Sequence, residues 1–477
     1  MNKILFVSSE VQPLIKTGGL ADVAGSLPIA LAELGQEVRI IMPKYHALKL
    51  DEEVEYRCTL RIDNRDVNIL QTHIPDTEVI IWLVDCPEYF DIPGNPYTDE
   101  FGNSWENNAA RFSLFCRVAV EVSQNRAHLD WKASIVHCND WQSGLVPALL
   151  TMEPHRPSTV FTIHNMAYQG LFPEETYFDL NLPGQLWNPG ALEFHELLSF
   201  IKGGIACADH ITTVSPNYAL EIQTAEYGYG LEGLLHHRHH ELNGIINGID
   251  INVWNPETDE RIAQNYNIAT LNKKAGNKAE LQKSHSLPLD PSIPLIGLIG
   301  RLVDQKGIDL VIDCLDKLVK LPVQFILLGS GDKGFEHRLK NLSYLYPDKI
   351  SVTIGYDENL AHLIEAGADM FLMPSRFEPC GLNQLYSQRY GTLPIVRKTG
   401  GLADTVVDAL PETIADKTAS GFVFEEPSVG TLLETIKRAL LLYANKRTWT
   451  QLQKNAMSKD FSWRQSAQQY LDLYNKL

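Results

Sequence analysis

Two cations follow an apolar segment in the second half of the chain. Arg301 and Lys306 lie within residues 300–307 (GRLVDQKG), directly after the apolar residues 295–299. If residues 295–299 form a parallel strand, both cations fall on a strand-to-helix loop at the carboxyl edge of a sheet, where α/β proteins bind ligands. Arginine and lysine there suit a diphosphate, because a guanidinium can hold two oxygens at once. Two solvated loop cations are the alternative interpretation.

A carboxylate and a cysteine follow a second apolar segment. Residues 374–384 (PSRFEPCGLNQ) come directly after residues 370–373. Glu378 can accept hydrogen bonds from sugar hydroxyls, and the glycine that follows can expose backbone N–H groups at a helix start. Cys380 could act as a nucleophile, but no His or Asp neighbours it in the sequence. A small packing residue is therefore the favoured interpretation of Cys380.

One glycine-containing heptapeptide occurs twice. Residues 16–22 (KTGGLAD) are repeated as residues 398–404, once in each half of the chain. Glycines before a helix let backbone N–H groups approach an anion, and Lys16 adds a full charge. The motif is neither a dinucleotide fingerprint nor a P-loop. The repeat indicates two similar halves that use one loop design twice; two chance βα turns are the alternative.

A carboxylate and an imidazole end two apolar segments of the first half. Asp140 and Trp141 follow residues 135–138, and His164 follows residues 159–163. Parallel strands would bring Asp140 and His164 to one sheet edge, where they could handle protons or hold hydroxyls. Trp141 offers a flat face for a sugar ring. Each of these residues could equally be a satisfied structural residue.

The elements that must position these residues alternate along the chain. Short apolar segments followed by longer helical segments predict βαβ units, and two such series predict two doubly wound domains. Strands are predicted at residues 4–8, 37–42, 79–84, 135–138, 159–163 and 210–214, and again at 295–299, 324–328, 351–354, 370–373, 394–396 and 421–424.

Composition excludes several classes of protein. The 477 residues carry a formal net charge of −18, so bulk attraction to nucleic acid or an anionic membrane is not expected. The chain contains no apolar run long enough to span a bilayer. Its seven cysteines are scattered without a C-x-x-C pair, and the histidines at 236–240 lack a carboxylate pattern. We therefore expect a cytoplasmic protein without disulfides or a metal site.

Taken together, these motifs resemble one known family. KTGGLADV, HCNDWQ, TIHN, NGID, GRLVDQKG, SRFEPCGL and TGGLADTV occur in the order seen in bacterial glycogen synthases and plant starch synthases of the ADP-glucose type. The resemblance spans essentially the whole chain. It implies the GT-B architecture, two Rossmann-like domains facing across a cleft, here 1–245 and 246–457, with a C-terminal helix in 458–477 that crosses back. It also implies metal- and cofactor-free transfer of glucose from ADP-glucose to the non-reducing end of an α-1,4-glucan (glycogen), with retention of configuration.

The resemblance implies roles for matching positions. Arg301 and Lys306 would neutralise the departing diphosphate, and Glu378 would hold glucose hydroxyls. His164 would touch the glucosyl group, and Asp140 would lie near the acceptor. The remaining substrate-binding positions would be Lys16, Gly18, Gly19, Tyr97, Asn247, Cys380, Gly381, Leu382, Thr399, Gly400 and Gly401.

One position separates this family from a broader group. Many retaining two-domain transferases carry a second glutamate eight positions after the first, whereas this chain has Tyr386, an aromatic residue as in the glycogen and starch synthases. A retaining reaction usually invokes a covalent nucleophile. No convincing carboxylate is evident, Asp140 being the nearest, so we favour same-face attack by the acceptor.

Other interpretations stay open. No base-reading residue is identifiable, so the residues alone leave ADP-glucose and UDP-glucose undistinguished. A different sugar-nucleotide enzyme on the same fold and a non-catalytic glucan-binding protein are the alternatives. A nicotinamide dehydrogenase is disfavoured because the chain lacks G-x-G-x-x-G.

Overall fold

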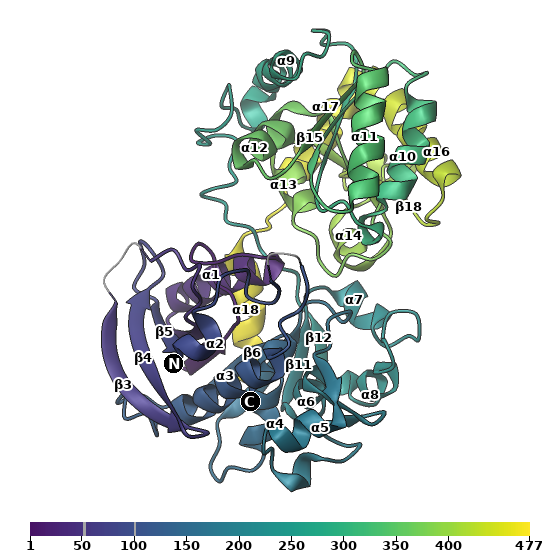
Figure 1. Cartoon of the computed structure of the whole chain (residues 1–477). Helices are drawn as coiled ribbons and strands as arrows, with labels where there is room; N and C mark the ends of the chain where they lie inside the picture. Colours follow the sequence, from purple (N-terminus) through teal and green to yellow (C-terminus); the bar gives the residue numbers. More distant parts are fainter. Residues whose placement is uncertain (51–53, 100–101) are drawn as a thin grey trace. The chain divides into compact units, whose positions relative to one another are not determined.

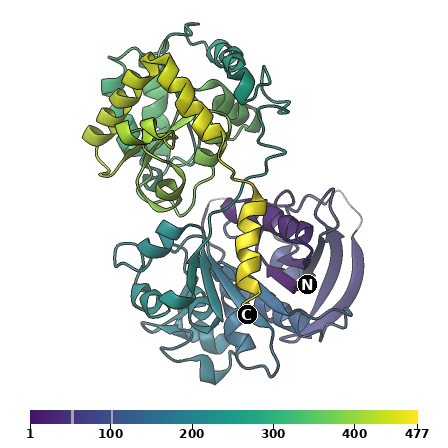
Figure 2. The same cartoon turned by 180° about the vertical axis from the view of Figure 1, so that it is seen from behind.

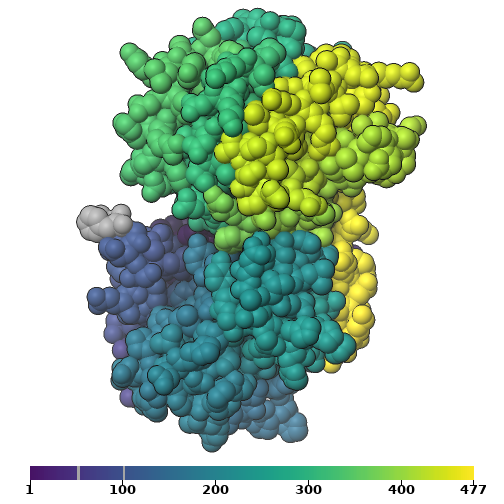
Figure 3. All heavy atoms as spheres, turned by 90° about the vertical axis from the view of Figure 1, so that its right-hand side faces the viewer, coloured from purple at the N-terminus to yellow at the C-terminus, as the bar shows by residue number. Residues whose placement is uncertain are grey.

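The chain folds into two compact α/β units. The computed structural model describes residues 1–50, 54–99 and 102–477. The first unit comprises Met1–Gly248 with Trp463–Leu477, and the second comprises Ile249–Ser462. The polypeptide therefore leaves the first unit after Gly248 and returns to it after Ser462, and Figures 1 and 2 show the returning helix in yellow. In Figure 3, residues near the C-terminus accordingly contribute to the surface of both units.

The first unit is built on a mixed sheet with the strand order β12-β11-β7-β6-β1-β2-β5-β4-β3. Its strands are β1 (Lys3–Val7), β2 (Glu37–Pro43), β3 (Glu55–Ile62), β4 (Arg65–His73), β5 (Ile80–Asp85), β6 (Ile135–Asn139), β7 (Ser158–Ile163), β11 (His210–Thr213) and β12 (Leu242–Gly244). Pairing is parallel from β12 to β5 and antiparallel for β4 and β3. A small antiparallel sheet contains β8 (Leu171–Pro173), β9 (Glu193–Phe194) and β10 (Leu197–Ser199).

The second unit is built on a parallel sheet with the order β15-β14-β13-β16-β17-β18. Its strands are β13 (Leu295–Ile299), β14 (Gln324–Gly329), β15 (Ile350–Ile354), β16 (Met370–Met373), β17 (Leu393–Arg397) and β18 (Phe422–Phe424). The interior strands are buried along almost their whole length, as expected for a parallel sheet with helices on both faces.

Helices cover the sheets of both units (Figure 1). The first unit contains α1 (Gly19–Glu33), α2 (Pro87–Phe90), α3 (Asn108–Ser123), α4 (Leu145–Leu150), α5 (Glu174–Asp179), α6 (Phe200–Cys207), α7 (Pro216–Glu221), α8 (Glu232–His237) and α18 (Trp463–Tyr474), with short 3-10 turns η1 (Trp141–Ser143), η2 (Gly184–Leu186) and η3 (His239–Glu241). The second contains η4 (Ile268–Lys273), α9 (Lys274–Ser284), η5 (Asp304–Lys306), α10 (Ile308–Leu318), α11 (Lys333–Leu345), α12 (Glu358–Gly367), α13 (Asn383–Arg389), α14 (Gly400–Thr405), α15 (Pro411–Ala415), α16 (Val429–Ala444) and α17 (Lys446–Met457). In the parts of the chain that the structure describes, no helix is both long and apolar enough to cross a membrane.

Every strand predicted from an apolar segment is present, within one residue at each end. The strands β3 and β4 were not predicted, because their exposed residues interrupt the apolar pattern. Their hairpin turns at Asp63 and Asn64, both with positive φ (47° and 61°). Two such residues give the turn whose twist matches that of paired strands.

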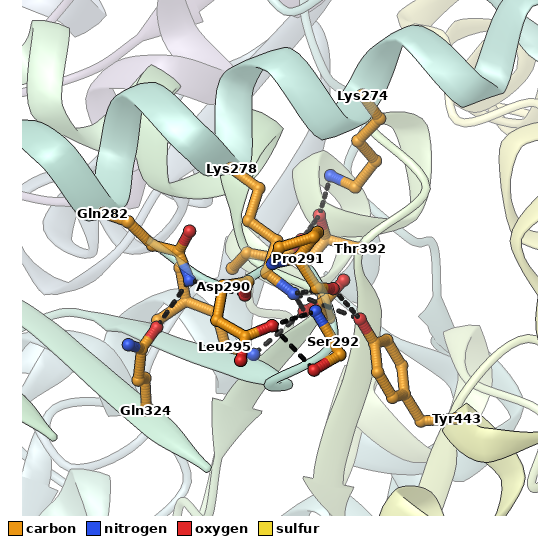
Figure 4. A network of polar contacts seen from close by, with 12 residues as sticks. Lys274, Lys278, Gln282, Asp290, Pro291, Ser292, Leu295, Gln324, Thr392 and Tyr443 are labelled. Carbon is orange, nitrogen blue, oxygen red and sulfur yellow. Dashed lines mark hydrogen bonds and ion pairs between the residues drawn. The ribbon is translucent and has the colours of Figure 1, made fainter. Parts of the chain in front are cut away.

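A buried polar network lies at the amino ends of the second unit's strands (Figure 4). Lys278 Nζ lies 2.7 Å from Asp369 Oδ2, which also accepts the Leu295 N–H at 2.9 Å. Lys274 donates to Thr392 Oγ1 at 2.7 Å, and burial lowers the pKa of this amine to about 7. These contacts tie α9 to the starts of β13, β16 and β17, and they leave the opposite edge of the sheet for ligands.

Candidate active site

The predicted diphosphate and sugar residues of the second unit meet at one sheet edge. Strand β16 pairs in parallel with both β13 and β17. The loop after β13 carries residues 300–307, the loop after β16 carries residues 374–384, and the loop after β17 carries residues 398–401. The strand order changes direction between β13 and β16. Ligands of open α/β sheets bind at such a switch point, outside the carboxyl ends of the strands.

Lys306 and Glu378 form an ion pair at this edge. Lys306 Nζ lies 2.5 Å from Glu378 Oε2, which also accepts the Ser375 hydroxyl at 2.9 Å. Glu378 is 6% exposed, and its second oxygen accepts no hydrogen bond in the described part of the chain. Lys306 is placed by the tight turn at Gly307 (φ 67°), where a Cβ would come within 2.3 Å of the Pro374 carbonyl oxygen.

Arg301 lies on the same edge and is exposed. Within residues 1–50, 54–99 and 102–477 it makes no ion pair, unlike Arg376, which bonds to Asp309. An exposed guanidinium without a carboxylate partner can hold two oxygens of a phosphate.

The loops after β16 and β17 are locked together by glycine contacts. Gly400 has a φ of 42°, and a Cβ there would come within 2.0 Å of the Glu378 carbonyl oxygen. The Gly401 N–H donates to the carbonyls of Glu378 and Pro379, both at 3.1 Å. A Cβ at Gly401 would lie 2.2 Å from the Cys380 carbonyl oxygen. The backbone of one loop therefore positions Glu378 on the other.

The other predicted site residues of these two loops lie where the loops after β16 and β17 touch. Gln384 donates from Nε2 to the carbonyls of Cys380 (2.9 Å) and Gly381 (3.0 Å). Cys380 and Thr399 are buried, and Leu382 is half-buried at the start of α13. Cys380, Gly381, Leu382 and Thr399 thus lie on the two loops that these contacts join.

The first unit has an equivalent edge after β1, β6 and β7. Strand β6 pairs in parallel with β1 and β7, and the strand order changes direction between β1 and β6. The loop after β1 carries Lys16, Gly18 and Gly19, whereas Asp140 and His164 follow β6 and β7.

A buried carboxylate that the sequence analysis did not single out organises the first of these loops. Glu10, 3% exposed, accepts the Thr17 N–H at 2.5 Å, the Thr17 hydroxyl at 2.9 Å and the Gly18 N–H at 3.3 Å. The half-buried Tyr97 donates its hydroxyl to Glu10 at 3.0 Å and lies 2.7 Å from the Ser9 hydroxyl. Burial raises the pKa of Glu10, and these hydrogen bonds oppose the rise. The sequence could have indicated Glu10 by its position just after the first strand.

The two copies of the repeat occupy different surroundings. Each copy contains the start of a helix, α1 at Gly19 and α14 at Gly400. A Cβ at Gly18 or Gly19 would meet no non-neighbouring described atom within 4 Å, whereas Gly400 and Gly401 are tightly enclosed. Lys16 is paired with Asp22 inside the repeat at 2.6 Å. Packing requires the glycines of the second copy, but it does not require those of the first.

Asp140 and His164 are joined through the backbone. Asp140 Oδ1 accepts the His164 N–H at 2.7 Å, and Asp140 has a φ of 55°, which is uncommon for a non-glycine residue. Burial raises the pKa of Asp140 to about 7 and lowers the pKa of His164 to about 3. His164 is therefore neutral at pH 7. Its Nε2 lies 2.9 Å from Asn139 Oδ1, so Nε2 carries the proton and Nδ1 can accept one from a hydroxyl.

Two further residues have contrasting outcomes. Asn247 is 6% exposed, and its Oδ1 is buried without a hydrogen-bond partner in the described structure, which marks an acceptor that a ligand could satisfy.

Trp141, expected to offer a face to a sugar, instead packs edge-on against Phe112 and Phe200, and Gly170 lies directly against its ring. The expectation for Trp141 was wrong because its rings complete the core beneath the loop after β7.

The chain is similar to known proteins over its whole length. Residues 3–237 match the starch synthase catalytic domain and residues 278–457 match the glycosyl transferases group 1 family. Glycogen synthase 1 of Methylococcus capsulatus is 56% identical over 99% of this chain and 96% of its own length. Glycogen synthase of Cellvibrio japonicus is 52% identical, with both chains fully covered.

The chain belongs to the family of bacterial glycogen synthases and starch synthases. The structure also matches the catalytic domain of starch synthase IV from Arabidopsis thaliana, bound to ADP and acarbose, with a TM-score of 0.90 and 32% identity over 100% of this chain and 99% of that chain. The predicted family, the glycosyltransferase activity and the GT-B class with two Rossmann-like domains are thereby confirmed. In this glycogen synthase family member, Tyr386 stacks on Trp254 at 3.9 Å.

Removal of the Glu10 carboxylate should loosen the first glycine loop selectively. In Glu10→Ala, the amides of Thr17 and Gly18 lose their acceptor, and we expect their hydrogen exchange to accelerate about tenfold. Hydrogen–deuterium exchange mass spectrometry of peptides from residues 11–22 measures this effect. The second copy at residues 398–404, held by the Glu378 and Pro379 carbonyls, is an internal control. Equal acceleration in both copies would show that Glu10 does not act locally.

The raised pKa of Asp140 predicts a pH-dependent stability difference. Between pH 4 and 7 the folded chain holds a proton on Asp140 that the unfolded chain, with a pKa near 3.8, releases. Wild-type stability from this group therefore falls as pH rises through this window, whereas Asp140→Asn cannot ionise. We expect the free energy of unfolding of the variant, relative to that of the wild type, to rise by on the order of 4 kcal/mol between pH 4 and pH 7. Above pH 7 this difference should stay constant. Thermal unfolding of both proteins between pH 4 and pH 7 measures the rise, and a constant difference over this range would contradict it.

Proposed function

We propose that this protein extends glycogen by transferring glucose from ADP-glucose to the non-reducing end of an α-1,4-glucan, with retention of anomeric configuration. The observation that supports this most strongly is the full-length identity of 56% and 52% to bacterial glycogen synthases. The ADP bound by the similar starch synthase IV supports an adenine nucleotide as donor. A reduced, cytoplasmic setting agrees with the seven cysteines, all of which are free thiols.

The second unit is proposed to hold the donor. Cleavage of the bond between glucose and the diphosphate leaves negative charge on the phosphates as positive charge grows at the anomeric carbon. Arg301 and Lys306 would stabilise that developing negative charge, which is commonly the largest contribution to such a reaction. The free oxygen of Glu378 would accept glucose hydroxyls. The backbone of residues 380–382 and 399–401 would line the glucose and phosphates.

The first unit is proposed to contact both substrates. Lys16 is 42% exposed, so a phosphate could compete with Asp22 for its ammonium group. The uncrowded glycines Gly18 and Gly19 would let their backbone approach the donor. Neutral His164 and the unpartnered oxygen of Asn247 would each accept a hydroxyl of the glucosyl group. Tyr97 would contribute its ring, since its hydroxyl is bonded to Ser9 and Glu10.

Labelled glucose provides the direct test of donor and product. We expect incorporation into precipitable glycogen from ADP-glucose and far less from UDP-glucose. Glu378→Ala and Lys306→Ala should each reduce incorporation at least about 100-fold, because each removes a charged contact to the reacting groups. Lys333→Ala, which removes an 87% exposed lysine from α11, is the matched control and should retain full activity. No incorporation from either donor by folded wild-type protein would contradict the proposal.

The retaining course is proposed to be same-face attack by the acceptor, without a covalent glucosyl-enzyme. Asp140 is the nearest carboxyl candidate for a nucleophile, but its pKa of about 7 leaves it half protonated and its Oδ1 is engaged by the His164 N–H. Asp140→Asn should therefore keep kcat within about tenfold of the wild type, whereas loss of a true nucleophile costs on the order of 10⁴-fold or more. Steady-state assays measure kcat. Mass-spectrometric detection of glucose bound to Asp140 would overturn same-face attack.

A further inference from the structure

Two exposed tyrosines lie on neighbouring loops of the first unit. Tyr168, 53% exposed, follows β7, and Tyr229, 44% exposed, lies between α7 and α8. Gln169 is 8% exposed and donates from Nε2 to the Tyr229 carbonyl at 3.2 Å, which ties the two loops together. The pKa of Tyr229 is raised by burial and by the neighbouring Tyr168, as expected if the two phenols lie close together.

Hydrogen bonds hold both loops, although the tyrosine side chains on them are exposed. The loop after β7 is held at its start by Asp140, which accepts the His164 N–H, and further along by the Tyr218 hydroxyl, which accepts the Met166 N–H at 3.0 Å. Tyr229 has a φ of 51°, an outlying conformation for a bulky residue. Burial of the side chain does not explain this backbone conformation, because the Tyr229 side chain is 44% exposed. Residues in such conformations cluster at ligand-binding positions.

Hydrogen bonds connect the loops that carry the two tyrosines to Asp140. Tyr168 lies four residues after His164 in the loop that Asp140 holds. The Tyr218 hydroxyl accepts the Met166 N–H in this loop, and the pKa of Tyr218 is raised by burial and further by both Asp140 and Tyr229. An extended glucan that ends near Asp140 would continue over adjacent surface, and the apolar face of a glucose ring packs well on an aromatic ring.

We propose that Tyr168 and Tyr229 form a stacking subsite for the glucan acceptor, next to Asp140 and His164. This inference rests on the proposed function. The subsite would bind glucose units behind the reacting end, and it would set the preference for longer acceptor chains.

Acceptor kinetics test the subsite. Tyr168→Ala, and Tyr229→Asn, which tolerates positive φ, should each raise the KM for maltoheptaose about tenfold. Both should leave the KM for ADP-glucose and kcat at saturating acceptor within twofold. Tyr168→Phe should behave as the wild type, since the ring is retained. Tyr344→Ala, which removes an 86% exposed tyrosine from α11 of the second unit, is the matched control. An unchanged maltoheptaose KM in both variants, or a loss confined to kcat, would overturn the subsite.

Direct binding separates this proposal from the proposed function. Isothermal titration of maltoheptaose into the full chain needs no turnover, so an inactive wild type would contradict the proposed function alone. Weakening of maltoheptaose binding by about tenfold in Tyr168→Ala, but not in Tyr344→Ala, would support the subsite. Equal affinity of wild type and Tyr168→Ala would refute it.

Discussion

Parallel strand pairing is the constraint on which the rest of this structure depends. Parallel strands all end at one edge, so the loops that follow adjacent strands must lie side by side. In the second unit this brings the loop after β13, with Arg301 and Lys306, next to the loop after β16, with Glu378. In the first unit the same constraint brings Asp140 next to His164. The candidate site residues of each unit lie at the point where the strand order reverses.

The repeated heptapeptide performs two physical tasks with one sequence. In the second unit its glycines allow backbone contact so close that no side chain would fit, and this contact positions Glu378. In the first unit the glycines are uncrowded, and the loop is held instead by the buried carboxylate of Glu10. One loop is rigid through packing and the other through hydrogen bonds to a single side chain. A loop held by one carboxylate can adjust to a substrate more easily than one held by backbone contacts.

Burial and charge are distributed in opposite ways at the two edges. In the first unit, burial keeps His164 neutral and raises the pKa of Asp140, which suits both groups to hydrogen bonding with hydroxyls. In the second unit Arg301 is exposed and makes no ion pair in the described part of the chain, and the partly exposed Lys306 is paired with Glu378. Neutral acceptors suit a sugar and cations suit a diphosphate, which agrees with the substrates of a glycogen synthase.

Apolar segments of three to six residues located twelve strands within one residue, because a strand buried on both faces leaves a local signal in the sequence. The short parallel strand β12 was not predicted. The loop motifs also identified the family and nominated most of the candidate site residues. Tertiary structure decided the partners: Glu10 for the first glycine loop, Asn139 for His164 and Ser375 for Glu378. It also decided that Trp141 is core, and that the half-exposed β3 and β4 extend the first sheet. Residue type and spacing are local properties of a chain, whereas a hydrogen-bond partner or a packing neighbour exists only after strands distant in sequence have aligned.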